Sequence, residues 1–267
     1  MKYFGFSDQG KIREHNEDAH GIYALADNAL LAVVCDGMGG LSCGEVASRL
    51  ALNTFVDTVR RIVSLRVRDN RLALEDREAY LVLSNSASLA NKAVMDYRRA
   101  HPECGEMGTT LVAAIICRHE DGATVSWINI GDSRIYTVDH RDILQVSRDH
   151  SYLQYLIDSG EMTPDEAARS VKKNLITRAI GLEDEIDPDI DTFPLSAKEC
   201  QMTHIFLCSD GFSGAISEEE CMAIVNNHSI PTEPKVKALI GRANALDGSD
   251  NITLVLVDLK GDDDATA

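Results

Sequence analysis

Long hydrophobic runs are absent from this sequence of 267 residues, and no apolar stretch approaches the ~18 residues that a membrane-spanning helix needs. The first residues, Met1 to Asp8, also lack the long apolar region of a signal peptide. Internal repeats, low-complexity stretches and linkers are missing as well. We therefore expect a cytoplasmic protein that contacts no membrane and forms one domain over residues 1–260.

Positive charge is scarce, because 26 Lys and Arg residues stand against 43 Asp and Glu residues and give a formal net charge of −17. Proteins that bind nucleic acids need Lys and Arg to contact the phosphates, so this balance argues against a nucleic-acid partner. Part of the acidic surplus lies in residues 261–267, which we expect to form a disordered acidic tail.

Paired cysteines and histidines are also missing. The seven cysteines contain no Cys-x-x-Cys pair, and the eight histidines show no His-x-x-x-His spacing. Cys35, Cys117 and Cys208 lie inside apolar runs, as small buried hydrophobic side chains do. We expect neither a zinc site nor a disulfide from any of the seven.

Aspartates at the ends of apolar runs are the main positive feature. Leu31 to Cys35 leads directly into Asp36 and a glycine-rich turn, and Ile205 to Cys208 leads in the same way to Asp210. A single Asp-Gly pair most often marks only a turn or a helix cap. Repetition favours another interpretation, since further carboxylates adjoin other expected strands: Glu17, Asp18, Asp132 and Asp250. Carboxylates gathered from several strand ends predict one shared site for a hard cation.

The apolar periodicity indicates how the chain is organised. Strand patterns occur at residues 3–7, 21–25, 30–35, 109–117, 123–130, 134–138, 143–146, 189–193, 204–208 and 252–257. Helical patterns occur at about 45–66, 75–99, 218–226 and 233–245, and short helical pieces at 149–181 suggest a flap. Strands in consecutive blocks do not form a βαβ alternation. They predict an α+β fold with two antiparallel sheets stacked face to face and helices covering the outsides.

Nine motifs occur in order: Ser7 to Gly10 with Arg13 and Asn16 to Asp18, Asp36 to Gly40, Gly44 to Ser48, Gly108 to Thr110, Asn129 to Arg134, Asp149 to Ser151, Thr177 to Gly181, Ser209 to Gly211, and Asp250 with Asn251. With them the chain resembles the metal-dependent protein phosphatases of the type 2C (PPM) family, in particular the compact bacterial serine/threonine phosphatases. The likeness extends from residue 3 to about residue 258 and implies a four-layer α-β-β-α sandwich with a binuclear metal site at one end.

The resemblance also implies residue roles. Asp36 would bridge two Mn²⁺ or Mg²⁺ ions. Asp210 and Asp250 would complete the coordination of the first ion, and the carbonyl of Gly37 would bind the second. Glu17 and Asp18 would hold metal-bound waters, and Arg13 would bind the substrate phosphate. Asp132 with Asp210 would bind a third ion more weakly. The chemistry agrees, because oxygen-only ligands suit these ions rather than zinc. The planar guanidinium of arginine also matches the oxygens of phosphate.

The expected function is hydrolysis of phosphoserine and phosphothreonine in proteins by direct attack of a metal-bridging water or hydroxide. The protein would act as a monomer opposing a bacterial serine/threonine kinase. The alternative is a catalytically silent domain that serves as a binding or regulatory module.

The general acid stays open, because Met38 occupies the position of a histidine in eukaryotic members and a thioether carries no proton. We favour a metal-bound water over His15 or His150 as the proton donor. Ser133 and Cys43 are weaker hypotheses for a nucleophile, since neither has an evident base.

Overall fold

The apolar run Leu31 to Cys35 forms the middle of β3 (Ala29–Met38), a strand buried on both faces. Leu31 packs into an apolar layer beneath helices, whereas its neighbour Ala32 packs into the layer between two sheets. Successive side chains of a strand point to opposite faces, so a strand covered on both sides needs a continuous apolar run. The computed structural model describes residues 1–40, 43–170, 175–227 and 229–260.

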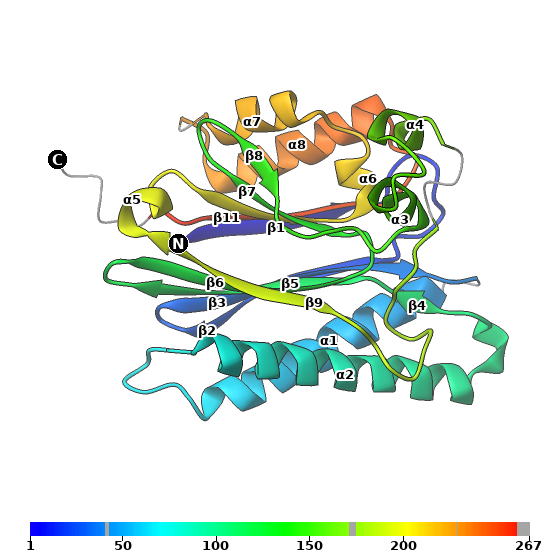
Figure 1. Cartoon of the computed structure of the whole chain (residues 1–267), viewed down its shortest axis with the longest axis horizontal. Coiled ribbons are helices and arrows are strands. Elements are labelled where there is room, and N and C mark those ends of the chain that lie inside the picture. The colour runs from blue at the N-terminus through cyan, green and yellow to red at the C-terminus, as the bar shows by residue number, and fades with distance from the viewer. Residues whose placement is uncertain (41–42, 171–174, 228, 261–267) are drawn as a thin grey trace.

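Two antiparallel sheets are stacked on each other (Figure 1). The first sheet contains, in spatial order, β1 (Lys2–Asp8), β11 (Ile252–Asp258), β10 (His204–Cys208), β7 (Arg134–Val138) and β8 (Ile143–Gln145). The second contains β2 (Asp18–Ala26), β3, β5 (Leu111–His119), β6 (Gly122–Ile130) and β9 (Asp189–Ser196), and the short β4 (Gly108–Thr109) pairs with β3.

Helices cover the outer face of each sheet, as Figure 1 shows. The second sheet packs against α1 (Cys43–Ser64) and α2 (Asp76–Ala100), and the first packs against α7 (Glu218–Val225) and α8 (Thr232–Leu246). Three apolar layers result, one under each helix pair and one between the sheets. The expected α+β fold of two antiparallel sheets with flanking helices is therefore confirmed.

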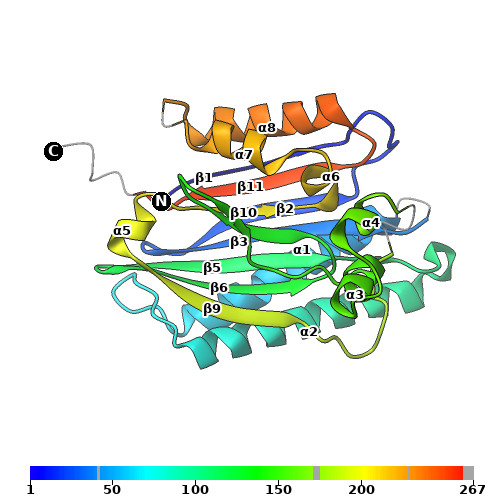
Figure 2. The same ribbon diagram turned by 45° about the horizontal axis from the view of Figure 1, so that its top comes forward.

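Several short elements lie outside this frame: η1 (Pro102–Cys104), α3 (Tyr152–Asp158), α4 (Pro164–Ala168), α5 (Ala197–Cys200) and α6 (Asp210–Ser213). Figure 2 shows α3, α4 and α6 gathered at one end of the sheets. Part of the expected flap, residues 171–174, and the expected acidic tail, residues 261–267, lie outside the described residues. Across the described residues, every helix is too short or too polar to traverse a lipid bilayer.

The expectation that no cysteine forms a disulfide is wrong. Cys43 and Cys104 are bonded to each other, with their Cα atoms 5.6 Å apart. The two residues are separated by 61 positions in sequence, and α2 with η1 returns the chain to the start of α1. Spacing along the sequence could not reveal this pair, because only the packing of the two helices brings it together.

Replacing Cys104 by serine is expected to lower the free energy of unfolding by about 2–4 kcal/mol, since the bridge closes a long loop of the unfolded chain. The measurement is a denaturant titration of the variant and of wild type, each with and without dithiothreitol. Wild type in reductant should match the variant, which should itself be unaffected by reductant. Equal stability of wild type in both conditions would contradict the prediction.

Candidate active site and metal centre

The end of β3 places Asp36 opposite Asp18 of β2 in the strand register. The strand β2 begins at Asp18, three residues before the predicted start, so this carboxylate belongs to the sheet and not to the preceding loop. Thr110 N and Thr109 Oγ1 both donate to the carbonyl of Asp36, and Asp36 N donates to Thr110 Oγ1. These hydrogen bonds fix the backbone of Asp36 at the point where the pairing of β3 with β5 ends.

The first sheet supplies Asp210 and Asp250. Asp210 follows the end of β10, and Asp250 precedes the start of β11, its antiparallel neighbour. The two carboxylates therefore lie at the same end of the sheet, where β10 ends and β11 begins. Gly211 is required here because a Cβ atom at this position would lie 2.2 Å from the carbonyl oxygen of Asn251.

Asp18 is buried, and one of its two carboxylate oxygens is fully satisfied. Its Oδ2 accepts hydrogen bonds from Ser209 Oγ (2.9 Å) and Thr253 Oγ1 (2.6 Å). Its Oδ1 is also buried but has no hydrogen-bond partner. A buried carboxylate oxygen without a donor is costly, and a hydrated cation nearby would satisfy it.

Seven of the eight predicted site residues line one small cavity of about 190 Å³: Arg13, Glu17, Asp36, Gly37, Asp132, Asp210 and Asp250. The eighth, Asp18, does not line the cavity and lies behind Asp36 in the adjacent strand. Met38 and Thr110 also line it. The structure thus brings together residues from both sheets and from the loop before β2.

The carboxylates raise one another's pKa values. Burial and the nearby charges of Asp18 and Asp210 raise the pKa of Asp36 well above its usual range. Burial and the charge of Asp210 raise the pKa of Asp132 to about 7. Burial also raises the pKa of Asp210, and the neighbouring charge of Asp250 adds to the effect. So much buried negative charge is unfavourable unless protons or cations neutralise it.

The residues present fit hard divalent cations. The converging side chains offer oxygen atoms, the ligand type that Mg²⁺ and Mn²⁺ prefer. Among the described residues, Arg13 is the one basic side chain on the cavity wall, and it already pairs with Asp250 (Nη2–Oδ2, 2.8 Å). In the described parts of the chain no three His, Cys, Asp or Glu side chains lie close enough together to hold a metal ion as they are placed.

Glu17 is positioned by the start of α1. Its carboxylate accepts hydrogen bonds from the backbone of Gly44 and Glu45, and burial raises its pKa. A helix N-terminus favours a carboxylate in this place. The sequence motif that contains Gly44 is explained by contact, since a Cβ atom there would lie 2.7 Å from the Glu17 carboxyl carbon.

Asn251 is a positioning residue that the residue-by-residue reasoning missed. Its Nδ2 donates to the carbonyls of Gln9 and His15, and its Oδ1 accepts from Glu17 N. One amide side chain therefore fastens the loop that carries Arg13 to the start of β11. Only its place beside Asp250 in the sequence could have drawn attention to it.

Three of the alternative catalytic candidates, His150, Ser133 and Cys43, are held by contacts of their own. His150 Nδ1 accepts from Gly131 N, and its Nε2 lies 3.2 Å from a carboxylate oxygen of Asp189. Ser133 is buried, with its hydroxyl hydrogen-bonded to Thr110. The hypothesis that Cys43 acts as a nucleophile is wrong, because its sulfur is in the disulfide.

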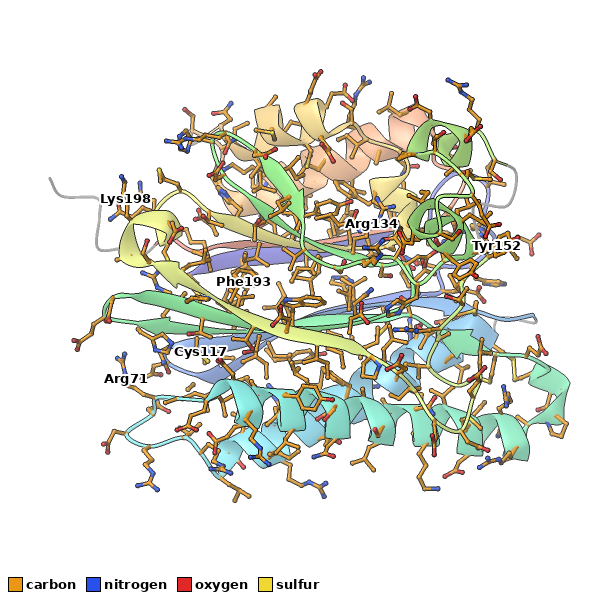
Figure 3. The ribbon with its side chains drawn as sticks, viewed as in Figure 1. Arg71, Cys117, Arg134, Tyr152, Phe193 and Lys198 are labelled. Atoms are coloured by element: carbon orange, nitrogen blue, oxygen red, sulfur yellow. A yellow bond between two sulfur atoms is a disulfide. The ribbon has the colours of Figure 1, made fainter. Side chains whose placement is uncertain are left out.

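A larger cavity of about 530 Å³ adjoins the small one and shares Asp132, Asp210 and Asp250 with it. Apolar side chains of α3 and α4 form one of its walls. Arg134 lies in this wall too, held by a two-pronged ion pair with Asp149. Figure 3 shows Arg134 and Tyr152 of α3 at the same end of the molecule.

Comparison with known proteins shows the family to which the chain belongs. Residues 11–247 match the sequence profile of the family described as "Protein phosphatase 2C". The chain belongs to the protein phosphatase 2C family. It is a metal-dependent serine/threonine protein phosphatase, as its family and its curated relatives establish.

Relatives of this phosphatase span nearly its whole length. It is 33% identical over 252 residues to a serine/threonine phosphatase, stp, of Listeria monocytogenes, covering 94% of this chain and 93% of the relative. The crystal structure of Stp1 from Staphylococcus aureus superposes with a TM-score of 0.82 at 30% identity, covering 97% and 95% of the two chains. The catalytic domain of PstP, solved with two manganese ions, gives a TM-score of 0.75 at 29% identity and covers 96% and 97%.

Proposed function

We propose that the small acidic cavity is the catalytic centre, where phosphoserine and phosphothreonine are hydrolysed. The polypeptide that carries the phosphorylated residue would lie in the adjoining, larger cavity. The observation that carries this assignment is the convergence of seven predicted residues, from both sheets and the loop before β2, on one cavity. A Mn²⁺-dependent assay with p-nitrophenyl phosphate and with a phosphopeptide tests it, since a catalytically silent domain would turn over neither.

Within this proposal, two Mn²⁺ or Mg²⁺ ions would be held by Asp36, Asp210, Asp250 and the carbonyl of Gly37. Glu17 and Asp18 act through water, and the unpartnered Oδ1 of Asp18 supports that role. Asp132 with Asp210 would hold a third, weaker ion. When bound, the ions would act as Lewis acids and would lower the pKa of a water molecule, so that it could attack phosphorus as hydroxide at neutral pH.

The chain's own residues position the substrate. Arg13 is about half exposed on the cavity wall and can turn from Asp250 toward a phosphate, where its planar fork binds two oxygens. The ion pair with Asp250 keeps the guanidinium at the cavity before substrate arrives. Asn251 fixes the loop beneath it, so less conformational entropy is lost when phosphate binds.

Replacing Arg13 by alanine is expected to raise KM for phosphate esters by about tenfold or more, with a smaller fall in kcat. The reason is that the guanidinium would contact phosphate equally in the ground state and the transition state. Steady-state kinetics on p-nitrophenyl phosphate and a phosphopeptide measure the effect. Lys11→Ala, a basic residue in the same loop outside the cavity, is the control, and unchanged KM values for Arg13→Ala would remove it from the site.

The segment 149–181, with α3 and α4, would act as a flap over the substrate. Its support is the larger cavity, where apolar side chains such as Leu153 and Ile157 face the shared aspartates. A polypeptide could lie there while its phosphate enters the smaller cavity. This part of the chain would therefore select among protein substrates and leave small aryl phosphates unaffected.

The cellular assignment is also a proposal. The protein dephosphorylates phosphoproteins, and we take its counterpart to be a bacterial serine/threonine kinase acting on the same substrates. We further propose that it works as a cytoplasmic monomer. The five free cysteines, all buried, suit a reducing compartment, whereas the Cys43–Cys104 bridge is unusual there. Comparing phosphoproteomes of cells with and without the enzyme identifies the substrates.

A further inference from the structure

A basic pocket lies where α1 connects to α2, at the opposite end of the molecule from the acidic site. It has a volume of about 490 Å³, and Arg66, Arg68, Arg71 and His119 lie in its wall. Figure 3 shows Arg71 near one end of the molecule and Arg134, which borders the acidic site, toward the other. In a chain with a net charge of −17, such a local excess of positive charge is an exception that needs a physical reason.

Two of the arginines face each other across a tight turn. Arg68 N donates to Arg71 O (3.0 Å), and Arg71 N donates to Arg68 O (2.8 Å). The two residues between them, Asp69 and Asn70, have φ angles of 47° and 60°. Positive φ at both central positions is the geometry of a two-residue hairpin turn. Directly opposed residues of such a pair project from the same face, so both arginine side chains leave the turn on one side, and both line the pocket.

This hairpin is fastened to the second sheet. The side chain of Asn28, in the turn between β2 and β3, donates to Leu72 O (2.9 Å) and accepts from Leu72 N (2.8 Å). Asp27 N donates to Asn70 O, and Leu72 itself is buried in the apolar layer under the helices. The backbone that carries the two arginines is therefore fixed in position by hydrogen bonds to the second sheet.

Both arginines are exposed, so water screens part of the repulsion between their charges. Like charges placed directly opposite each other in a strand pair destabilise it. Among the described residues, the acidic side chain in the pocket wall, Glu78, is already paired with Arg66. Neither Arg68 nor Arg71 has an ion-pair partner in the part of the chain that the structure describes. A rigid turn thus holds two uncompensated guanidinium groups toward one cavity.

We propose that this basic pocket binds a phosphate monoester, held between Arg68 and Arg71, at a site separate from the catalytic centre. A phosphate dianion can accept two-pronged hydrogen bonds from each guanidinium and neutralises both charges. Leu65, 81% exposed, also lines the pocket and offers apolar contact to a residue beside the phosphate. We assign the ester to a phosphoserine or phosphothreonine segment of a protein, an assignment of source that rests on the proposed function.

The site would anchor one phosphorylated residue of a multiply phosphorylated partner while another is hydrolysed. It differs from a nucleic-acid surface, because the basic residues gather at one open pocket in an otherwise acidic protein. Free inorganic phosphate shares the same recognition chemistry, and the experiment separates these two sources.

The test is an NMR titration of the full-length, Mg²⁺-loaded enzyme with a peptide that carries a non-hydrolysable phosphonate analogue of phosphoserine. We expect the backbone amides of residues 67–73 to shift, separately from those around the catalytic centre. Arg68→Gln with Arg71→Gln should weaken binding at residues 67–73 by about tenfold or more. Arg61→Gln with Arg77→Gln changes the net charge equally outside the pocket and should not weaken it.

Parallel titrations use the unmodified peptide, orthophosphate, sulfate and a single-stranded oligonucleotide. Binding of the phosphonate peptide but not of the unmodified peptide supports the proposal. Orthophosphate binding as tightly as the peptide would overturn the phosphoprotein as the source and assign the pocket to free phosphate. Equal shifts with sulfate or the oligonucleotide, or no shift at residues 67–73, would overturn the site itself.

Turnover of p-nitrophenyl phosphate by the same samples separates this inference from the proposed function. Both double variants should retain wild-type kcat and KM for this small substrate, since neither pair lines the acidic cavity. Loss of binding with unchanged turnover is the expected result for Arg68→Gln with Arg71→Gln. A wild-type enzyme without turnover would instead contradict the proposed function and leave the binding result intact.

Discussion

Asparagine in place of Asp36 or Asp210 is expected to lower metal-dependent kcat by about a thousandfold or more, roughly 4 kcal/mol of barrier. The same substitutions should raise the melting temperature of the metal-free protein. Both carboxylates are buried beside other carboxylates, which raises their pKa values, and a neutral amide removes that repulsion. Saturating Mn²⁺ should reverse the order of stability, because wild type gains binding free energy that the variants lack.

Thermal melts with and without Mn²⁺, combined with kinetics, measure both effects. Asp57→Asn is the matched control, since Asp57 is an exposed aspartate on α1, remote from the cavity. It should change neither turnover nor the response to metal. Wild-type rates at limiting metal in either active-site variant would show that the carboxylate is not a ligand.

Removing the carboxylate of Asp132 is expected to leave the two tight ions in place but to lower kcat on a phosphopeptide about a hundredfold. Asp132 lies where the two cavities meet, and burial with the charge of Asp210 raises its pKa to about 7. Such a position suits a weaker ion that keeps most of its waters. The loss should be smaller on p-nitrophenyl phosphate, whose leaving group needs little proton donation.

Calorimetric metal titration of Asp132→Ala, alongside kinetics on both substrates, makes this measurement. Asp121→Ala is the control, because Asp121 is an exposed aspartate that lines neither cavity. Full activity of Asp132→Ala on the phosphopeptide would contradict the prediction. Loss of the tight ions as well would show that the third site is not separate.

The central strands of the fold could be predicted because they are covered on both faces. A continuous apolar run such as Leu31 to Cys35 has few alternatives in a folded chain, and it forms the middle of β3 as expected. The boundaries were less predictable. The strand β2 begins with Asp18 because Ser209 and Thr253 satisfy a carboxylate that would otherwise mark a loop.

The residues that line the cavity were predictable because the sequence places charged groups and glycines at successive strand ends, in motifs that resemble a known family. Their supports were not, since they depend on contacts between segments far apart in the sequence. Asn251 fastens a loop more than 230 positions away, and its amide could equally have capped a turn. The Cys43–Cys104 bridge and the Arg68–Arg71 hairpin likewise follow from packing that no local pattern expresses.

The pairing of the first strand has a consequence for the order in which the protein can mature during synthesis. β1 is an edge strand whose neighbour in the sheet is β11, along its full length from Lys2 opposite Asp258 to Asp8 opposite Ile252. Asp250 and Asn251, which complete the cavity and its loop, belong to the same late segment. At typical elongation rates, the ribosome needs on the order of 10–50 s to travel from one strand to the other. The nascent chain therefore cannot complete this cavity until that segment emerges, and its first strand cannot pair until the last strand has been made.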